Sequence, residues 1–493
     1  MKRPSRNKPR FQPDSALFAG LIILLLWLPL PWGSHSGWAI STAGAVTFAL
    51  LSVWFLLALL NQTRMPRRTA KLAIPLLLWG AWLGWIAFQT FSLPPLMLGA
   101  LSPGSLKIHQ SIAAMHEKPP FYTLSIAPGI TWLKFLESSL YFGLYLLCIL
   151  LIRSDRRLRI TLGTLLLSGL IQASYGSLML MTGTGLGWLQ KKTFYLESAT
   201  GTFVNQNHFA GYLEIAAAAG IALVLADLGG ETGGWSFRKL AGRLLDLSLS
   251  AKVRARAALV LIAVGLVLSR SRMGNLAFFT AVSAGGLAYV ILRERQMFVK
   301  ALILFASVLA VDVMLVANRF GLEHVIERLD TTRLAQEGRV KLLAEIGPVV
   351  ERYAITGSGL GTFSLAYEPY RSEDMTEYMT HAHNDYVEFF VETGLIGTTL
   401  LGGLLLWHAL HAWRVAFKRQ HRLKVAAAFA MMMAMLSLGA HAVAEFNFQI
   451  PAIAGTFVVL LGTIAACSER SRRRVEDPEE IGEPLSEPNP EPT

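Results

Sequence analysis

The feature that most constrains this chain is a series of apolar segments long enough to cross a lipid bilayer. A membrane-spanning helix needs about 20 residues, and about twelve segments approach or exceed that length, of which the seventh is the shortest. They cover residues 15–33, 39–60, 71–92, 129–152, 160–184, 208–226, 257–270, 274–292, 301–317, 387–410, 424–444 and 450–467. Charged residues make up only 16% of the chain, against about 25% in soluble domains. We therefore expect an all-α polytopic membrane protein.

Basic residues indicate how these segments are oriented. Lys and Arg gather in short clusters after every even-numbered span, as in Arg64, Arg67 and Arg68 after the second and "RRR" at 472–474 after the last. Cytoplasmic loops of membrane proteins carry such an excess of positive charge. Both termini are therefore predicted to be cytoplasmic. Because this topology accounts for the net charge of +12, we do not expect a nucleic-acid partner.

The spans divide the chain into a basic cytoplasmic N-terminus, a transmembrane region and an acidic, proline-rich tail, which cover residues 1–14, 15–467 and 468–493. The composition of the tail predicts disorder. The longest outward loop, 318–386, is too long to be a simple connection. Within it, apolar residues at helical spacing between Val340 and Tyr353 predict an amphipathic helix, interrupted near Pro348.

The predicted topology places the concentrated polar motifs on the outward side. The first is "TGTFVNQNHFAGYL" at 200–213, where Asn205, Asn207 and His208 lie at the entry to the sixth span. These side chains could face a substrate, or the asparagines could simply cap a helix.

Two further motifs carry arginine. Arg270 and Arg272 lie in the outward turn "SRSRMGN" at 269–275, where positive charge runs against the usual bias. They could extend toward lipid headgroups or bind an anion, because guanidinium holds phosphate oxygens bidentately. Arg339 follows Gly338 in "AQEGRVKLLAE" and could add to an anion site, although taken alone it fits a solvated surface better. The glycines of "TGSGLGTFSLAY" at 356–367 lack the strand–helix context of a nucleotide loop and predict a turn.

The last motif is "THAHNDYVEFFVETGLIG" at 380–397, directly before an apolar run. His381 and His383, with Asp385 or Glu388, could ligate a metal, but the spacing is not a standard zinc signature. A histidine with a pKa near 6.5 is also a competent general base, whose ring a nearby carboxylate can orient. A purely structural histidine is the third alternative.

Taken together and in this order, these motifs resemble the O-antigen ligase and polymerase superfamily, whose members are membrane glycosyltransferases acting on undecaprenyl-diphosphate-linked glycans. The resemblance covers roughly 195–410 and includes "HNDYVEFFVETGLIG" at 383–397, in which His-Asn is followed by Gly394 and Gly397. It implies a GT-C-like helical bundle with a large, partly helical extracytoplasmic loop. One departure is the acidic Glu197 in "YLESATGTF", where relatives often carry a basic residue; Lys191 and Lys192 lie upstream.

The resemblance also implies roles for single residues. By position, Arg272 and Arg339 would bind the donor diphosphate and His383 would activate the acceptor hydroxyl, with Arg270, His381 and Asn384 as second-rank candidates. The implied partners are an undecaprenyl-diphosphate-linked glycan donor and a membrane-tethered glycolipid or glycan acceptor at the periplasmic face of the bacterial inner membrane. We expect no cofactor and no metal.

Four functions remain open at this point. The first is a ligase that moves a finished glycan to an acceptor such as lipid A–core. The second is a polymerase that extends the glycan on its carrier with the same residues. The third is transfer onto protein hydroxyls by a related oligosaccharyltransferase. The fourth, of a different class, is a transporter or flippase, for which twelve spans are also typical, but which predicts charged residues and broken helices at mid-membrane.

Overall fold

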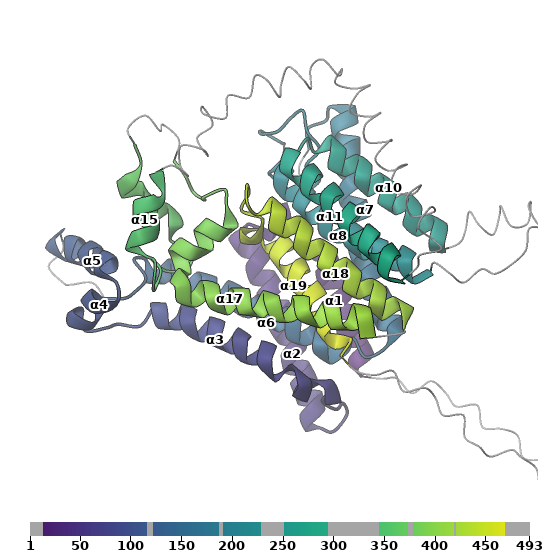
Figure 1. The fold of residues 1–493 in the computed structure, drawn as a ribbon, viewed down its shortest axis with the longest axis horizontal. Coiled ribbons are helices and arrows are strands. Elements are labelled where there is room, and N and C mark those ends of the chain that lie inside the picture. Colours follow the sequence, from purple (N-terminus) through teal and green to yellow (C-terminus); the bar gives the residue numbers. More distant parts are fainter. Residues whose placement is uncertain are drawn as a thin grey trace, which may run out of the picture.

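The computed structural model describes residues 13–115, 122–186, 191–227, 251–293, 345–372, 378–418 and 421–468. In these ranges the chain consists of helices and their connections, with no β-structure beyond one isolated bridge between Leu186 and Lys191. The helices pack side by side into one bundle (Figure 1). Seven of them are long and apolar enough to cross a membrane. The chain is therefore an all-α polytopic membrane protein, as predicted.

Eleven of the twelve predicted spans coincide with helices. These are α1 (Asp14–Trp27), α2 (Gly37–Leu59), α3 (Ala73–Gln89), α6 (Pro128–Leu151), α7 (Asp155–Thr182), α8 (Gln206–Asp227), α10 (Ala251–Leu268), α11 (Arg272–Arg293), α17 (Asp385–Lys418), α18 (Arg422–His441) and α19 (Pro451–Ala466). The ninth predicted span, 301–317, lies outside the described residues. Helices α1 and α19 are apolar but shorter than the rest.

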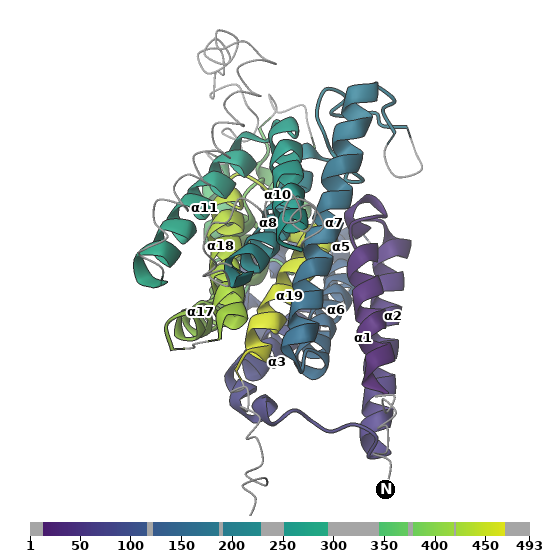
Figure 2. The same cartoon turned by 90° about the vertical axis from the view of Figure 1, so that its right-hand side faces the viewer.

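Small residues allow the central helices of the bundle to pack closely. Helix α8 is the most buried of the long apolar helices and packs against α7, α10 and α18 (Figure 2). A side chain added at Gly169 of α7 would meet Ala216 of α8, and one added at Gly220 would meet Leu166 of α7. Close backbone approach between small residues is how helices associate in a membrane, where burial of apolar surface gives little driving force.

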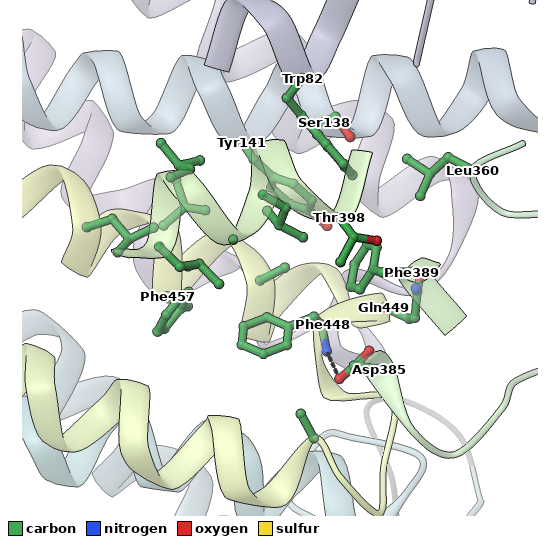
Figure 3. Close-up of a pocket in the computed structure, with 18 of the residues that line it drawn as sticks. Trp82, Ser138, Tyr141, Leu360, Asp385, Phe389, Thr398, Phe448, Gln449 and Phe457 are labelled. Carbon is green, nitrogen blue, oxygen red and sulfur yellow. Dashed lines mark hydrogen bonds between the residues drawn. The ribbon is translucent and has the colours of Figure 1, made fainter. Parts of the chain in front are cut away.

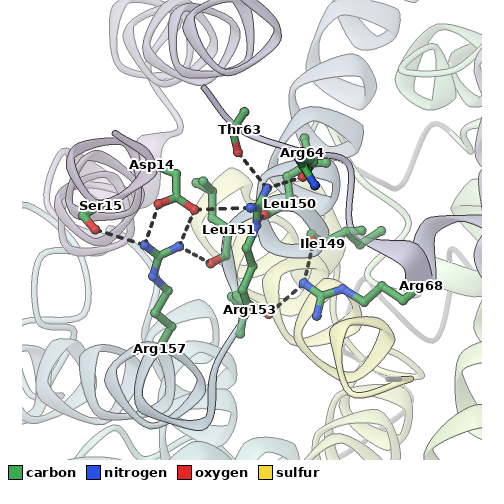
Figure 4. A network of polar contacts seen from close by, with 11 residues as sticks. Asp14, Ser15, Thr63, Arg64, Arg68, Ile149, Leu150, Leu151, Arg153 and Arg157 are labelled. Carbon is green, nitrogen blue, oxygen red and sulfur yellow. Dashed lines mark hydrogen bonds and ion pairs between the residues drawn. The ribbon is translucent and has the colours of Figure 1, made fainter. Parts of the chain in front are cut away.

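The two described ends of the chain, at the start of α1 and the end of α19, lie on the same face of the bundle (Figure 2). The Arg68 guanidinium donates to Ala466 O at the end of α19 (3.1 Å) and to Ile152 O after α6 (2.7 Å). Nearby, Arg157 of α7 donates both Nη groups to the Asp14 carboxylate at the start of α1, each at 3.0 Å (Figure 4). We call this the termini face, and the opposite end of the bundle the outer face.

A small subdomain covers part of the outer face. It contains α4 (Pro95–Leu101), α5 (Pro103–Met115), α15 (Gly347–Arg352) and α16 (Phe363–Tyr367), which lie together beyond the ends of α3 and α17 (Figure 1). Its separate apolar core includes Val349, Tyr353, Phe363 and Tyr367. Of the predicted amphipathic helix, residues 340–344 lie outside the described ranges, and α15 carries Pro348 in its first turn.

Helix α17 is broken at Gly394, whose φ of 65° and ψ of −172° are not helical. The glycine-rich turn takes the main-chain groups that the break leaves unpaired: Ser358 N donates to Val391 O and Gly359 N donates to Glu392 O, each at 2.9 Å. A Cβ at Gly357 would lie 2.2 Å from Glu392 O. The predicted turn at 356–367 therefore fixes the outer end of α17 against the subdomain.

Candidate functional site

The outer ends of α8, α17 and α18 converge on one aromatic ring, Phe446, in the connection between α18 and α19. Three histidine rings surround it and form what we call the histidine cluster. His381 stacks flat on Phe446 at 4.1 Å between centroids, while His208 (4.6 Å) and His383 (4.9 Å) meet it edge to face. The structure thus brings together residues from two predicted motifs that are far apart in sequence.

Two of these histidines pair with carboxylates. His383 Nδ1 lies 3.4 Å from Glu445 Oε2, and His381 Nδ1 lies 2.7 Å from Glu388 Oε1. The carboxylates are buried, whereas both histidine side chains keep about a fifth of their surface exposed, at 23% and 22% respectively. A contact at Nδ1 fixes the ring and its tautomer, so that Nε2 is the nitrogen that can accept a proton.

The asparagines of the two motifs cap helices or position a carboxylate. Asn384 Oδ1 accepts from Val387 N (3.1 Å) and caps α17, and Asn205 Oδ1 accepts from Asn207 N (2.8 Å) and caps α8. Asn207 instead donates from Nδ2 to Glu445 Oε1 (2.5 Å). Its amide therefore holds the carboxylate that faces His383. His383 itself has a left-handed backbone, with φ of 48°, which is uncommon for a residue other than glycine.

The arginine turn, residues 269–272, joins α10 to α11 at the same end of the bundle. Arg270 Nη1 donates to Glu197 Oε2 (2.9 Å), and Ala199 N donates to Leu268 O (2.8 Å), so the segment before α8 is docked on this turn. Arg272 is exposed in the first turn of α11, where the helix dipole adds positive potential. Arg339 lies outside the described residues.

The acidic Glu197, which departs from the family pattern, and the upstream Lys192 both lie in the segment before α8. The side chain of Glu197 is 80% exposed, so its ion pair with Arg270 is of the weak, solvent-screened kind. Lys192 Nζ donates to Ser198 O (2.6 Å), and burial lowers the pKa of Lys192 to about 8. One acidic and one basic side chain therefore flank the arginine turn.

The alternative of a metal site can be compared with the geometry. Asp385, one of its proposed ligands, has its carboxylate turned to accept from Phe448 N (3.1 Å). Glu388 accepts from Ala382 N (2.8 Å) besides contacting His381. Within the described ranges, no group of three or more His, Cys, Asp or Glu side chains is arranged to hold a metal ion.

Sequence reasoning missed Glu445 and Phe446. The stretch "EFNFQIP" at 445–451 stands out only as a short outward connection, and its contact with His383 spans 62 positions in the chain. The available signal was an acid and an aromatic residue placed at the outer end of a span, where an ionisable group is costly and commonly functional.

The structure thus defines a multi-pass helical membrane protein that carries histidine–carboxylate pairs and an arginine turn at its outer face. Residues 257–402 match the family model described as O-antigen ligase. This match supports the predicted resemblance to the O-antigen ligase and polymerase superfamily, whose members are glycosyltransferase-like ligases and polymerases. No curated protein matches the chain. The matched range includes Arg270, Arg272, His381 and His383 but ends before Glu445.

Proposed function

We propose that the protein transfers a glycan from undecaprenyl diphosphate to an acceptor hydroxyl, such as one on lipid A–core, at the periplasmic face of the bacterial inner membrane. The observation that carries this proposal is the His383–Glu445 pair, in which a buried carboxylate contacts Nδ1 of a partly exposed imidazole. This arrangement suits a general base that must act on an alcohol at the membrane surface.

The reaction is a single displacement that inverts the anomeric centre. Nε2 of His383 takes the hydroxyl proton while the acceptor oxygen attacks the anomeric carbon, and the bond from that carbon to the diphosphate oxygen breaks. The electron pair stays on the diphosphate, whose developing charge Arg272, Arg270 and Arg339 stabilise without protonation. Glu445 stabilises the imidazolium that forms, as the carboxylate partner of a catalytic histidine does. This mechanism is metal-independent.

His381 is the alternative base, and one observation favours it. Its Nδ1 lies closer to a carboxylate than that of His383, at 2.7 Å against 3.4 Å. However, its ring is stacked flat against Phe446, which covers one face. The resemblance to the family's motif, in which the histidine before asparagine is the base, favours His383. We therefore keep His383 as the proposed base.

Reconstitution with a defined lipid-linked glycan tests the proposal. Purified protein with donor and an acceptor glycolipid is expected to form the glycosylated acceptor, and replacement of Arg272 or His383 by Ala is expected to abolish it. Product formation that required added Zn²⁺ after treatment with a chelator would overturn the metal-independent mechanism. Growth of the glycan on its carrier in the absence of any acceptor would identify a polymerase, the second candidate.

A transporter is favoured only by the broken helix α17 and by a buried pair inside the bundle. His441 Nδ1 contacts Glu214 Oε1 at 2.7 Å, and both side chains are inaccessible to solvent. This pair lies near the outer end of α18, and Ser437 also donates to Glu214 (2.6 Å), so it links α8 to α18. Movement of a lipid-linked glycan across proteoliposomes without transfer would favour the transporter.

A further inference from the structure

The bundle contains an apolar cavity that the proposed reaction does not yet use. Its volume is about 350 Å³, and it lies among α3, α6, α17, α18 and α19 (Figure 3). Its walls are mostly aliphatic and aromatic, with Phe389, Leu404 and Phe457 among them. A cavity of this size holds about a dozen groups the size of a water molecule in the liquid, at roughly 30 Å³ each. It therefore fits one aliphatic chain rather than a folded glycan.

One end of the cavity is polar and carries unsatisfied atoms. Asp385 Oδ1, Gln449 Nε2 and Thr398 Oγ1 line it, and each is buried without a hydrogen-bond partner among the residues that the structure describes. Buried polar atoms are nearly always paired, so a cluster of orphans around an empty space indicates water or a ligand with polar groups. The three atoms together offer an acceptor, a donor and a hydroxyl.

The position of this polar end relates it to the histidine cluster. Asp385 is two residues after His383, and Asp385 N donates to Ala442 O (2.9 Å) and to Glu445 O (3.2 Å). The arginine turn, in contrast, belongs to α10 and α11, which pack on α7, α8 and α18. In the ribbon, α10 and α11 lie on one side of α18 and α3 and α17 on the other (Figure 1). The cavity and the arginine turn therefore belong to different sides of the bundle.

Charge distinguishes the two sides as well. The lining of the cavity has one ammonium group, Lys134, which is paired with Glu137 at 2.9 Å, and a second carboxyl in Asp385. Such a set has no excess of positive charge to hold a diphosphate, but it can bind hydroxyl groups. The lining also includes Tyr386, which is 55% exposed, and the exposed Gly402. The cavity is therefore accessible from the flank of the bundle.

We propose that this cavity holds the aliphatic chain of the lipid acceptor, with the hydroxyl-bearing head group at Asp385 and Gln449. The inference rests on the proposed function and adds the acceptor's anchor to it. A chain seated there brings the head group to the side of His383 opposite the arginines. The two membrane-tethered substrates then reach the base from separate directions, as a displacement requires.

Photolabelling of the full-length protein in phosphatidylcholine nanodiscs tests the assignment. The acceptor probe is a dodecyl glucoside with a diazirine at the end of its chain, and the donor-like probe is a diazirine-bearing farnesyl diphosphate. We expect the glucoside probe to label peptides that contain 401–405, 435–442 or 454–461, and the diphosphate probe not to label them. Labelling of these peptides by the diphosphate probe, or by neither probe, would overturn the assignment.

A glycine on the cavity wall provides the matched variants. Gly402 lines the cavity and has open space where a Cβ would be, as does Gly84, which is exposed on α3 away from the cavity. Gly402→Trp is expected to reduce glucoside labelling about tenfold and to raise the KM for acceptor with the KM for donor unchanged. Gly84→Trp is expected to change neither, and equal labelling of both variants would contradict the proposal.

Failure of this inference can be told apart from failure of the proposed function. Labelling requires binding only, so His383→Ala is expected to keep it while losing transfer. Retained transfer in His383→Ala with normal labelling would remove the proposed base and leave the cavity assignment intact. Absent labelling with transfer lost in His383→Ala would remove only the cavity assignment.

Discussion

The two ends of the bundle carry polar clusters of similar size but opposite character. On the termini face, both oxygens of Asp14 accept from Arg157, and Arg68 donates to main-chain oxygens at the ends of two helices. On the outer face, His381 and His383 are each held through Nδ1 by a buried carboxylate and are partly exposed. On the termini face the polar groups are hydrogen-bonded to one another, which stabilises the fold. On the outer face each histidine is held at one ring nitrogen, and its other nitrogen remains available to react. The first cluster is therefore expected to be structural and the second catalytic.

The largest expected effect is at His383. Replacement by Ala should lower glycan transfer by about 10²- to 10⁴-fold, the usual contribution of a general base, and leave thermal unfolding unchanged. The measurement is product formation from a lipid-linked donor. His421→Ala is the matched control, because His421 pairs with Asp155 on the termini face. Equal activity of the two variants would remove the distinction between the faces.

The second prediction distinguishes the two histidine–carboxylate pairs. Glu445→Gln should lower the rate about tenfold or more, since it removes the charge that stabilises the imidazolium, and should shift the pH profile of the reaction. Glu388→Gln should have the smaller effect on transfer. The reverse order would identify His381 as the base.

The third prediction concerns stability on the termini face. Arg157→Gln should destabilise the protein by up to roughly 3–5 kcal/mol, because it leaves the largely buried Asp14 without its main partner. The KM values should not change. The melting temperature of the detergent-solubilised protein measures the effect, and Arg156→Gln, an exposed neighbour, is the control. A loss of activity at unchanged melting temperature would contradict a structural role.

The smallest effect is expected at Lys192, whose pKa is lowered to about 8 by burial. Below pH 8 its ammonium group adds positive charge beside the arginine turn, and that charge is lost as the pH rises through 8. Lys192→Gln should therefore raise the KM for donor about two- to threefold at pH 7, since screened charges contribute well under 1.4 kcal/mol. At pH 9 the variant and the wild type should agree. A difference that persisted at pH 9 would exclude the charge as its cause.

The fold was predictable from the sequence because a bilayer imposes a length on every helix that crosses it. Window hydropathy therefore located α2, α6 and α8 to within a few residues. Hydropathy contains no information on which side chains from different segments contact one another. The packing of α5 against α15 and the pairing of Glu445 with His383 join segments that are distant in sequence, and no local pattern encodes either contact.

The candidate site was predictable only in part for the same reason. His381, His383, Arg270 and Arg272 were found because polar residues beside apolar spans are conspicuous. The capping of helices by Asn205 and Asn384 followed a general rule that left open whether those residues also met substrate. The role of Asn207 as a donor to Glu445 depends on a contact between α8 and the α18–α19 connection. Only the assembled bundle places those two segments together.

The break at Gly394 has a consequence for how the protein tolerates different membranes. Long helices adapt to a thicker or thinner bilayer by tilting, and a rigid α17 would carry that tilt to its outer end. The helix is interrupted at Gly394, and hydrogen bonds of Val391 and Glu392 before the break and of Leu395 after it fasten it to residues 354–359. A change of inclination therefore falls on the residues of α17 that follow this joint. His383 can then keep its contact with Glu445 while the rest of the helix tilts to match the thickness of the bilayer.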